Sequence, residues 1–258
     1  MIEINDIEKT FDDKQILFGI SAKFYDGKTN LIIGQSGSGK TVLMKSLVGL
    51  VTPEKGEILF DGRDLMKMSI SQRKELRKEI GMLFQGSALF DSETVLGNVM
   101  FPLVMFSDMS DEEKRERAQF CIDRVNLTGA EKKYPSEISG GMQKRVAIAR
   151  AIALNPKYLF CDEPNSGLDP KTSIVIDELL HDITSEYKIT TIINTHDMNS
   201  VLGIGENIIF INKGHLNWTG SMNEIYNSDN EVLNNFVFAT ELFQDVRKYR
   251  MAHSVYSC

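Results

Sequence analysis

The chain has 258 residues, 42% of them hydrophobic and 25% charged, which is the composition of an ordinary globular protein with a sizeable core. Its formal net charge of −7 argues against nucleic-acid binding, which needs a basic surface, so we expect no nucleic-acid partner. The cysteines Cys121, Cys161 and Cys258 are odd in number and widely spaced. This argues against a disulfide framework or a metal site and indicates a reducing compartment.

Two features bear on membranes. The first residues, MIEINDIEKTF, contain acids and no apolar core, so we expect no signal peptide. The longest charge-free apolar stretch runs over the 14 residues from Thr94 to Ser107 and is broken by Gly97 and Pro102. It is too short to cross a bilayer. We therefore expect a soluble protein whose membrane role would come through a partner.

The predicted strands fall into two groups. Apolar or alternating runs form the first group, at residues 2–11, 14–24, 29–34 and 56–62. The second group lies at residues 157–164, 190–197 and 207–218. Helical patterns lie between these strands, notably at residues 40–50 and 172–187. Strands that alternate with helices predict an α/β fold with a mostly parallel sheet.

The run GQSGSGKT follows the predicted strand 29–34 and opens the predicted helix 40–50. It matches the phosphate-loop pattern G-x-x-x-x-G-K-[ST]. Glycines let backbone N–H groups close on phosphate oxygens, Lys40 supplies a charge to the β- and γ-phosphates, and Thr41 supplies a hydroxyl to Mg²⁺. A chance glycine-rich turn is the alternative, and the flanking strand and helix disfavour it. The predicted site consists of Gly34, Gln35, Ser36, Gly37, Ser38, Gly39, Lys40 and Thr41.

The middle of the chain, from about residue 87 to 155, shows helical periodicity and charge runs. The only convincing strand nearby is IGMLFQ, just before it. Ser110 and Glu113 form the pattern of a capping box that opens a helix. The charge run SDEEKRERAQFCIDRV is expected to be a solvated helix face. We interpret this region as a helical subdomain inserted into an α/β core.

The stretch EISGGMQKRVAIARAIALNP reads as a helix that begins after Ser139 and is closed by Pro156. One predicted face carries Met142, Val146, Ala149 and Ala153. A helix N-terminus with free N–H groups can bind an anion, so Ser139, Gly140 and Gly141 predict a second phosphate site.

The run YLFCDEP is an apolar strand that ends in two acids. At the end of a buried parallel strand, Asp162 can hold Mg²⁺ beside the phosphate loop. Glu163 would project towards the γ-phosphate, where a carboxylate can orient and deprotonate water. The alternative is that the acids only terminate the strand, and the phosphate loop makes that alternative weaker.

Five features follow one another along the chain: Gly34–Thr41, Gln85, ISGGMQ, LFCDEPNSGLDP and His196. In this order they resemble an ABC-type ATPase, and the resemblance covers residues 2–230 or so. The resemblance implies a P-loop (RecA-like) core with N-terminal antiparallel strands and an inserted helical subdomain. It implies one ATP-binding domain at residues 1–235, with its core at 1–86 and 156–235 and the insert at about 87–155. Residues 236–258 would be a C-terminal extension.

The resemblance also implies ATP and Mg²⁺ as cofactors and a head-to-tail dimer with ATP between the subunits. Ser139, Gly140 and Gly141 would then bind the γ-phosphate of the ATP held by the partner's Lys40. A dimer of this kind is two-fold and isologous.

Four further roles follow by position. Phe11 is similar to the aromatic that stacks on adenine, with an ordinary core phenylalanine as the alternative. Gln85 is similar to the glutamine that contacts Mg²⁺ and the attacking water. Asp169 lies in a loop that would cross the dimer interface. His196 is similar to the histidine that contacts the γ-phosphate, with a structural role as the alternative.

Two residues depart from the pattern of the family. Met142 occupies a position where glutamine is common, and Asn165 occupies one where threonine is common.

The runs GMLFQGSALFDSETVLGNVMFPL and YPSEISGGMQKRVAIARAIALNP are similar to the ATPase of MCE/Mla-type phospholipid transporters. This implies a peripheral subunit on the cytoplasmic face of the inner membrane. Its partners would be a polytopic permease, an MCE-domain protein and a small STAS-domain subunit. Part of Thr94–Ser107 would receive a permease helix, or else pack internally.

Other functions stay open at this point. The same ATPase could serve another cargo, such as an amino acid, a metal or a lipoprotein. A soluble ABC protein of iron–sulfur assembly, translation or DNA repair and a non-hydrolysing clamp are further alternatives. The C-terminal tail is expected to bury Leu233, Phe236, Val237 and Phe243 on one helical face and to dock on the neighbouring subunit or fray.

Overall fold

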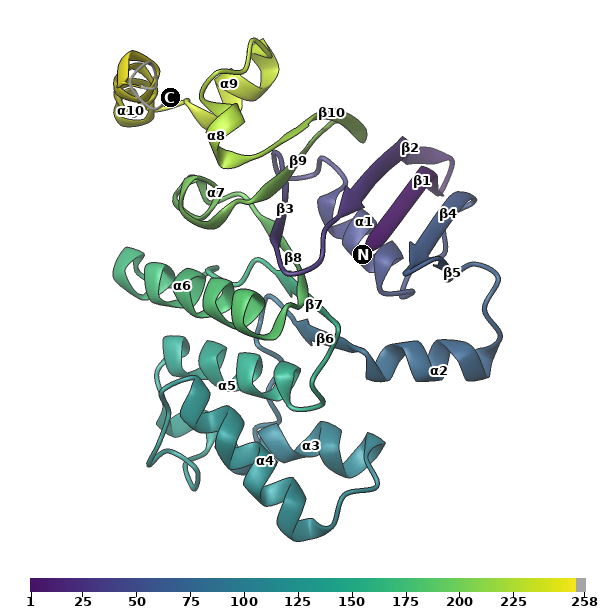
Figure 1. The fold of residues 1–258 in the computed structure, drawn as a ribbon, viewed down its shortest axis with the longest axis vertical. Coiled ribbons are helices and arrows are strands. Elements are labelled where there is room, and N and C mark those ends of the chain that lie inside the picture. The colour runs from purple at the N-terminus through teal and green to yellow at the C-terminus, as the bar shows by residue number, and fades with distance from the viewer. Residues whose placement is uncertain (254–258) are drawn as a thin grey trace.

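The computed structural model describes residues 1–253, which form two sheets with helices around them (Figure 1). The smaller sheet has four antiparallel strands in the order β2-β1-β4-β5. Its strands are β1 (Ile2–Phe11), β2 (Lys14–Phe24), β4 (Lys55–Phe60) and β5 (Arg63–Asp64). The bounds of β1 and β2 coincide with the predicted strands, and apolar side chains of both, such as Ile2, Ile4 and Leu17, are buried in the core.

The larger sheet has six strands in the order β10-β9-β3-β8-β7-β6, parallel except for the edge strand β10. Its strands are β3 (Thr29–Ile33), β6 (Ile80–Leu83), β7 (Tyr158–Asp162), β8 (Thr190–Thr195), β9 (Asn207–Asn212) and β10 (His215–Gly220). All residues of β3 and β8 are buried, as expected of a parallel sheet covered on both faces. The predicted α/β fold, with a mostly parallel sheet and antiparallel N-terminal strands, is confirmed.

One predicted strand proved to be two. The segment 207–218 folds back as the β9–β10 hairpin, with Lys213 at φ 49° and Gly214 at φ 80°. Two consecutive residues with positive φ make the tight turn whose twist suits antiparallel strands. The polar run at residues 212–215 is a turn signal that the single predicted strand overlooked.

Helix α1 (Lys40–Leu47) lies between the two sheets. Its Leu43 and Leu47 belong to a buried cluster that includes Ile4 of the smaller sheet and Ile192 of the larger one. The helix that carries the phosphate loop is therefore held from both sides. It ends three residues before the predicted Leu50, because the chain turns at Gly49 with φ 71°.

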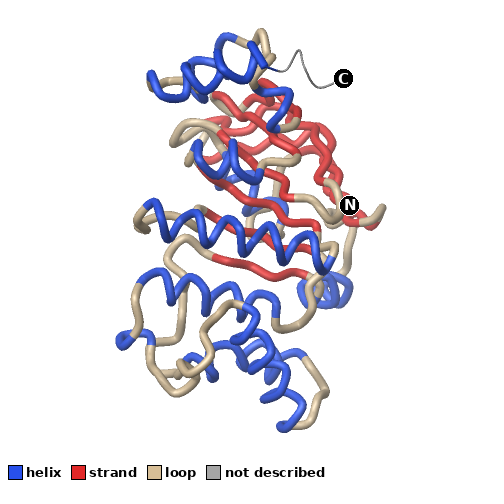
Figure 2. The backbone as a smooth tube through the Cα atoms, turned by 60° about the vertical axis from the view of Figure 1, so that its left-hand side comes forward, coloured by secondary structure: helices blue, strands red, loops and turns tan. Residues whose placement is uncertain are grey.

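Other helices flank the larger sheet, at α2 (Ile70–Lys78), α6 (Pro170–Tyr187), α7 (Met198–Ile204), α8 (Met222–Ile225), α9 (Glu231–Val237) and α10 (Glu241–His253). Figure 2 shows α6 running along the sheet. Helix α6 starts two residues earlier than predicted, because Asp169 caps it and Pro170 suits the first helical position.

The predicted helical region lies beyond the β6 edge of the sheet (Figure 1). It contains α3 (Val95–Phe106), α4 (Asp111–Arg124), the 3₁₀ turn η1 (Pro135–Glu137) and α5 (Gly140–Ile152). The capping box at Ser110 and Glu113 is confirmed, since each side chain accepts a hydrogen bond from the other residue's backbone N–H. Val146 and Ala149, on the predicted face of α5, are buried, and so is Ala153, which caps the helix. The helix ends at Ile152, before the predicted Pro156.

The C-terminal helices pack on the main core. Leu233 and Val237 are buried, and Phe236 and Phe243 pack against the same cluster at its edge. Arg247 of α10 donates to the backbone oxygens of Tyr226 and Ser228, at 2.9 and 2.8 Å. The predicted apolar face of this tail is therefore present in α9 and α10. Cys258 and the other residues after 253 lie outside the described residues.

Candidate active site

The phosphate loop connects β3 to α1 and encloses the side chain of Lys40. The Lys40 ammonium donates to the backbone oxygens of Gly34 and Gln35, at 2.8 and 3.0 Å. Burial lowers the pKa of Lys40, while the nearby carboxylates of Glu163 and Asp162 act in the opposite direction. Lys40 is thus a buried cation close to the predicted base, Glu163, and to the predicted metal ligand, Asp162.

Glycine is required at two positions of this loop. Gly34 has φ 151°, and a Cβ there would lie 2.1 Å from the backbone oxygen of Ile211. Gly39 caps α1 with φ 105°, a conformation that favours glycine. Between them, Gln35, Ser36 and Gly37 are exposed and Ser38 is buried. The hydroxyl of Ser38 has no hydrogen-bond partner among the described residues, so it is available to a ligand in the loop.

Asn194, at the end of β8, joins the loop to the acidic strand end. Its Nδ2 donates to Oδ1 of Asp162 at 2.5 Å and to Oγ1 of Thr41 at 3.3 Å. The Asp162 carboxylate and the Thr41 hydroxyl therefore lie side by side. Oxygen donors of this kind are the ligands that Mg²⁺ prefers, so the residues present fit the predicted ion.

Glu163 and His196 form a pair. Oε2 of Glu163 lies 2.8 Å from Nδ1 of His196. Glu163 follows β7 with φ 49°, and its backbone N–H donates to the Asn194 oxygen at 2.9 Å. His196 follows β8 directly rather than ending it, and its side chain is 67% exposed, against 14% for Glu163. The strand ends thus place a carboxylate and an imidazole together at the opening of the site.

Gln85 lies two residues beyond the end of β6 rather than on the strand. Its Nε2 is 3.4 Å from the hydroxyl of Ser166, in the turn that follows Glu163. The buried Lys144 of α5 donates to the backbone oxygen of Gln85. Burial lowers the pKa of Lys144, while Cys161, Asp162 and Glu163 act to raise it.

Lys144 was missed by sequence reasoning. A lysine is normally placed on the solvated face of a helix. The one signal of burial was that Lys144 stands four residues before the buried Ile148, which puts both residues on the same face of α5. A second missed residue is Phe243 of α10, which lines the same cavity as Glu163 and His196. A residue so far along the chain carries no local signal of that position.

Ser139 and Asp169 begin neighbouring helices. The Ser139 hydroxyl accepts from the backbone N–H of Met142 at 3.3 Å, and Asp169 accepts from that of Thr172 at 3.0 Å. A Cβ on Gly141 would lie 2.6 Å from Cγ2 of Thr172. Within residues 1–253, no hydrogen bond connects Ser139–Gly141 to the phosphate loop. The chain thus brings the second anion site beside the start of the helix that Asp169 caps.

Phe11 is at the end of β1 and is 43% exposed, so it is not a core side chain. The Lys9 ammonium lies 4.8 Å from the centre of its ring. An exposed ring next to a cation is available to stack on a planar base.

The family model described as ABC transporter matches residues 17–166. The chain belongs to the ABC transporter family. It carries the family's ATPase domain and so binds ATP. Within residues 1–253, no helix has both the length and the apolarity needed to span a bilayer.

Named relatives are similar over most of the chain. A Mycobacterium bovis protein, "Probable ribonucleotide transport ATP-binding protein mkl", is 37% identical over 92% of this chain. The chain spans 66% of that relative's length. The "Methionine import ATP-binding protein MetN" of Clostridium acetobutylicum is 38% identical, over 88% of this chain and 70% of the relative.

Two solved structures of the family have the same fold. The ATP-binding cassette MJ0796, described as dimeric in a post-hydrolysis state bound to ADP and Pi, is 32% identical with a TM-score of 0.78. The match covers 86% of this chain and 99% of that one. The cbiO1 protein of Clostridium perfringens is 28% identical with a TM-score of 0.83, over 95% and 98% of the two chains.

Proposed function

We propose that this chain is the ATP-hydrolysing subunit of a phospholipid transporter, in which it drives a partner permease. Residues 1–235 would form its ATP-binding domain, with the helical insert at about 87–155 and an extension from 236 onward. The observation that carries the hydrolytic part is the Glu163–His196 pair beside the Asp162–Asn194–Thr41 contacts. A base, an orienting imidazole and oxygen donors for a metal then meet at one end of the sheet.

The residues divide the chemistry among them. Lys40 and the backbone N–H groups of the loop bind the phosphates of ATP. Thr41, Asp162 and Gln85 would hold Mg²⁺, which offsets the phosphate charge when it is bound. Glu163 accepts a proton from the attacking water. His196 fixes the direction of that carboxylate through its Nδ1 and contacts the γ-phosphate.

The second anion site supports a head-to-tail dimer. Ser139, Gly140 and Gly141 form the N-terminus of the 13-residue helix α5, where backbone N–H groups and the helix dipole favour a phosphate. Because no hydrogen bond links them to the chain's own loop within residues 1–253, we infer that they cover the ATP held by the partner subunit. Asp169 begins the next helix, on the same side of the interface.

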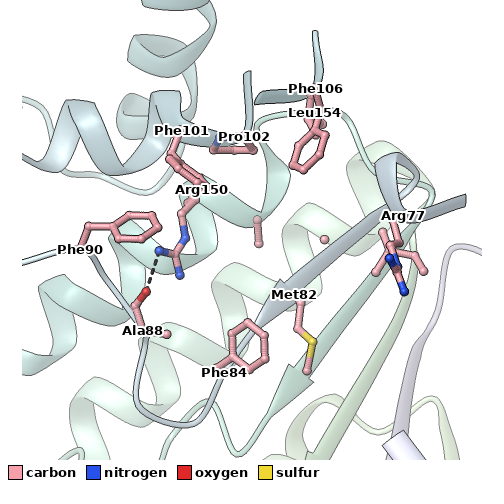
Figure 3. Close-up of a pocket in the computed structure, with 13 residues that line it drawn as sticks. Arg77, Met82, Phe84, Ala88, Phe90, Phe101, Pro102, Phe106, Arg150 and Leu154 are labelled. Atoms are coloured by element: carbon pink, nitrogen blue, oxygen red, sulfur yellow. Dashed lines mark hydrogen bonds between the residues drawn. The ribbon is translucent and has the colours of Figure 1, made fainter. Parts of the chain in front are cut away.

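The permease contact is proposed at an apolar groove of about 330 Å³ next to β6 (Figure 3). Its lining includes Phe84, Phe90, Phe101, Pro102 and Arg150. Arg150 donates to the backbone oxygens of Ala88 and Ser87 at 2.8 Å, which fixes one wall.

Helix α3 contributes Phe101 and Phe106 to this groove, and each ring is at least 40% exposed. The neighbouring Val104 and Met105 are more than half exposed. An amphipathic helix of a membrane partner fits such a groove, which would hold this subunit at the cytoplasmic face of the inner membrane.

The cargo proposal rests on sequence. The runs around Gln85 and Ser139 are similar to those of MCE/Mla-type ATPases, which implies an MCE-domain protein and a STAS-domain subunit as partners. The names of the relatives point instead to ribonucleotides or methionine. These are the alternative cargoes, because the permease and not the ATPase selects what is carried.

Co-purification tests the proposal. The tagged full-length chain, carrying Glu163→Gln to hold ATP in the dimer, is extracted from membranes in mild detergent. Bound proteins and lipids are then identified by mass spectrometry, with a Lys40→Ala chain as the control that binds ATP poorly. A permease, an MCE-domain protein and phospholipid would support the proposal. A different permease without an MCE partner would overturn the cargo, and recovery only from cytosol would overturn the transport role.

A further inference from the structure

A buried polar cluster lies behind the Glu163–His196 pair. It consists of Asn165, in the turn after β7, Asp177 of α6 and Ser200 of α7. Nδ2 of Asn165 donates to Oδ1 of Asp177 at 2.8 Å and lies 3.0 Å from the Ser200 hydroxyl. Ser200 also lies near enough to Asp177 to favour its ionised form, which lowers the pKa of that carboxyl. One amide thus connects three separate segments of the chain.

The cluster is costly to bury. Asp177 is 6% exposed and Ser200 is 1% exposed. Burial raises the pKa of Asp177 to about 6, and Asp197 adds to the rise, while Ser200 and Asn165 oppose it. Isolated carboxylates are disfavoured in the interior, and an apolar trio would fill the same space at a lower cost. This cost favours a role for the cluster beyond packing.

The position of the cluster indicates what it restrains. Asn165 is two residues after Glu163, whose backbone has φ 49° and needs surrounding contacts to hold it. Ser200 is four residues after His196, in the first turn of α7. Because the His196 side chain is largely exposed, packing does little to fix it, and its place depends on the backbone at the start of α7.

We propose that Asn165 and Asp177, with Ser200, are positioning residues that hold Glu163 and His196 in register for hydrolysis. The cluster joins the turn that carries the base to the helix that follows the histidine, through α6. Asn165 is oriented by the two bonds of its Nδ2 alone, since its Oδ1 has no partner among the described residues. Loss of either bond would let the two strand ends move independently. The proposal rests on the role of Glu163 as the base.

The test compares steady-state ATP hydrolysis by the full-length chain, alone and in the membrane complex that co-purifies with it. Asn165→Ala and Asp177→Ala are each expected to lower kcat about 10-fold or more, since small misplacements of reacting groups have large effects on rate. KM for ATP should stay within about 2-fold, because the hydrogen bonds of the cluster within residues 1–253 join Asn165 to Asp177 and Ser200 and not to the phosphate loop. The double variant should be no slower than the slower single one, as expected of residues that act as a unit.

Two further variants separate positioning from stability. Asp177→Asn keeps an oxygen that can accept from Asn165, so it should retain kcat within about 2-fold of the wild type. Thr184→Ala is the matched control on the same helix, because the buried Thr184 bonds to Leu180 and Thr191 and does not touch the cluster. It should lower the melting temperature without changing kcat.

Some results would overturn this inference. One is an unchanged kcat in Asn165→Ala. Another is that Asn165→Ala and Thr184→Ala, when they lower the melting temperature equally, also lower kcat equally. A Glu163→Gln variant measured in parallel separates the two proposals. If Glu163→Gln abolishes turnover and Asn165→Ala does not, only the positioning role is wrong. If Glu163→Gln turns over normally, the base assignment itself is wrong.

Discussion

Glu163→Gln is the most informative single change in this protein. The glutamine has the shape of the glutamate, and its amide can still donate to Nδ1 of a neutral His196, which lies 2.8 Å from the present carboxylate. Folding and ATP binding should therefore be preserved. What is lost is the proton acceptor, and a general base contributes about 10²–10⁴-fold to the rate.

That range corresponds to about 3–5 kcal/mol of activation free energy, at about 1.4 kcal/mol per tenfold change in rate. We expect kcat to fall at least about 100-fold, with the Kd for ATP unchanged and the ATP-bound dimer longer-lived. Phosphate release measures kcat, and size-exclusion chromatography with ATP measures the dimer. Glu178→Gln, which alters an exposed glutamate of α6, is the control with the same change of charge. Hydrolysis at the wild-type rate by Glu163→Gln would refute the reasoning.

Three further outcomes are expected. Ser139→Arg in one subunit of a mixed dimer should disable the ATP site of the other subunit, and inactivation of its own site instead would exclude the composite arrangement. Gly34→Ala should abolish ATP binding and lower the melting temperature, because its Cβ would meet the Ile211 oxygen at 2.1 Å; Gly37→Ala, with open space around it, should be milder. Burial raises the pKa of Asp177 to about 6, above the 3.8 of a solvated aspartate, so its contribution to stability is largest in acid and is lost as pH rises between these values. Asp177→Asn should therefore raise the free energy of unfolding by about 3 kcal/mol at pH 8 and by little at pH 4, and a pH-independent difference in urea melts would contradict this.

Much of the fold could be predicted because its signals are local. The strand patterns over residues 2–11 and 14–24 are carried by neighbouring residues, and both strands have the predicted bounds. The phosphate loop is equally local, since its glycines, Lys40 and Thr41 are consecutive. The turn at Lys213 and Gly214 had a local signal as well, the polar run at residues 212–215, which the predicted strand 207–218 overlooked.

Contacts between distant segments carry no such signal. The burial of Lys144 against the backbone of Gln85 joins residues 59 positions apart, and Asn165 meets Ser200 across 35. No periodicity within a helix or a strand records such a meeting. Sequence reasoning noted that Asn165 departs from the commoner threonine, but it had no partner to assign to its amide.

The sequence by itself determined which chemical groups this protein has and which strand or helix end carries each of them, because hydrogen bonding along the backbone and the spacing of apolar residues are short-range. Only the tertiary structure decided which groups meet. The parallel strands β7 and β8 bring Glu163 and His196 together, and α6 and α7 close a buried polar cluster behind them. These meetings depend on how the sheet orders its strands and on how the helices pack, and both are set by the whole core at once.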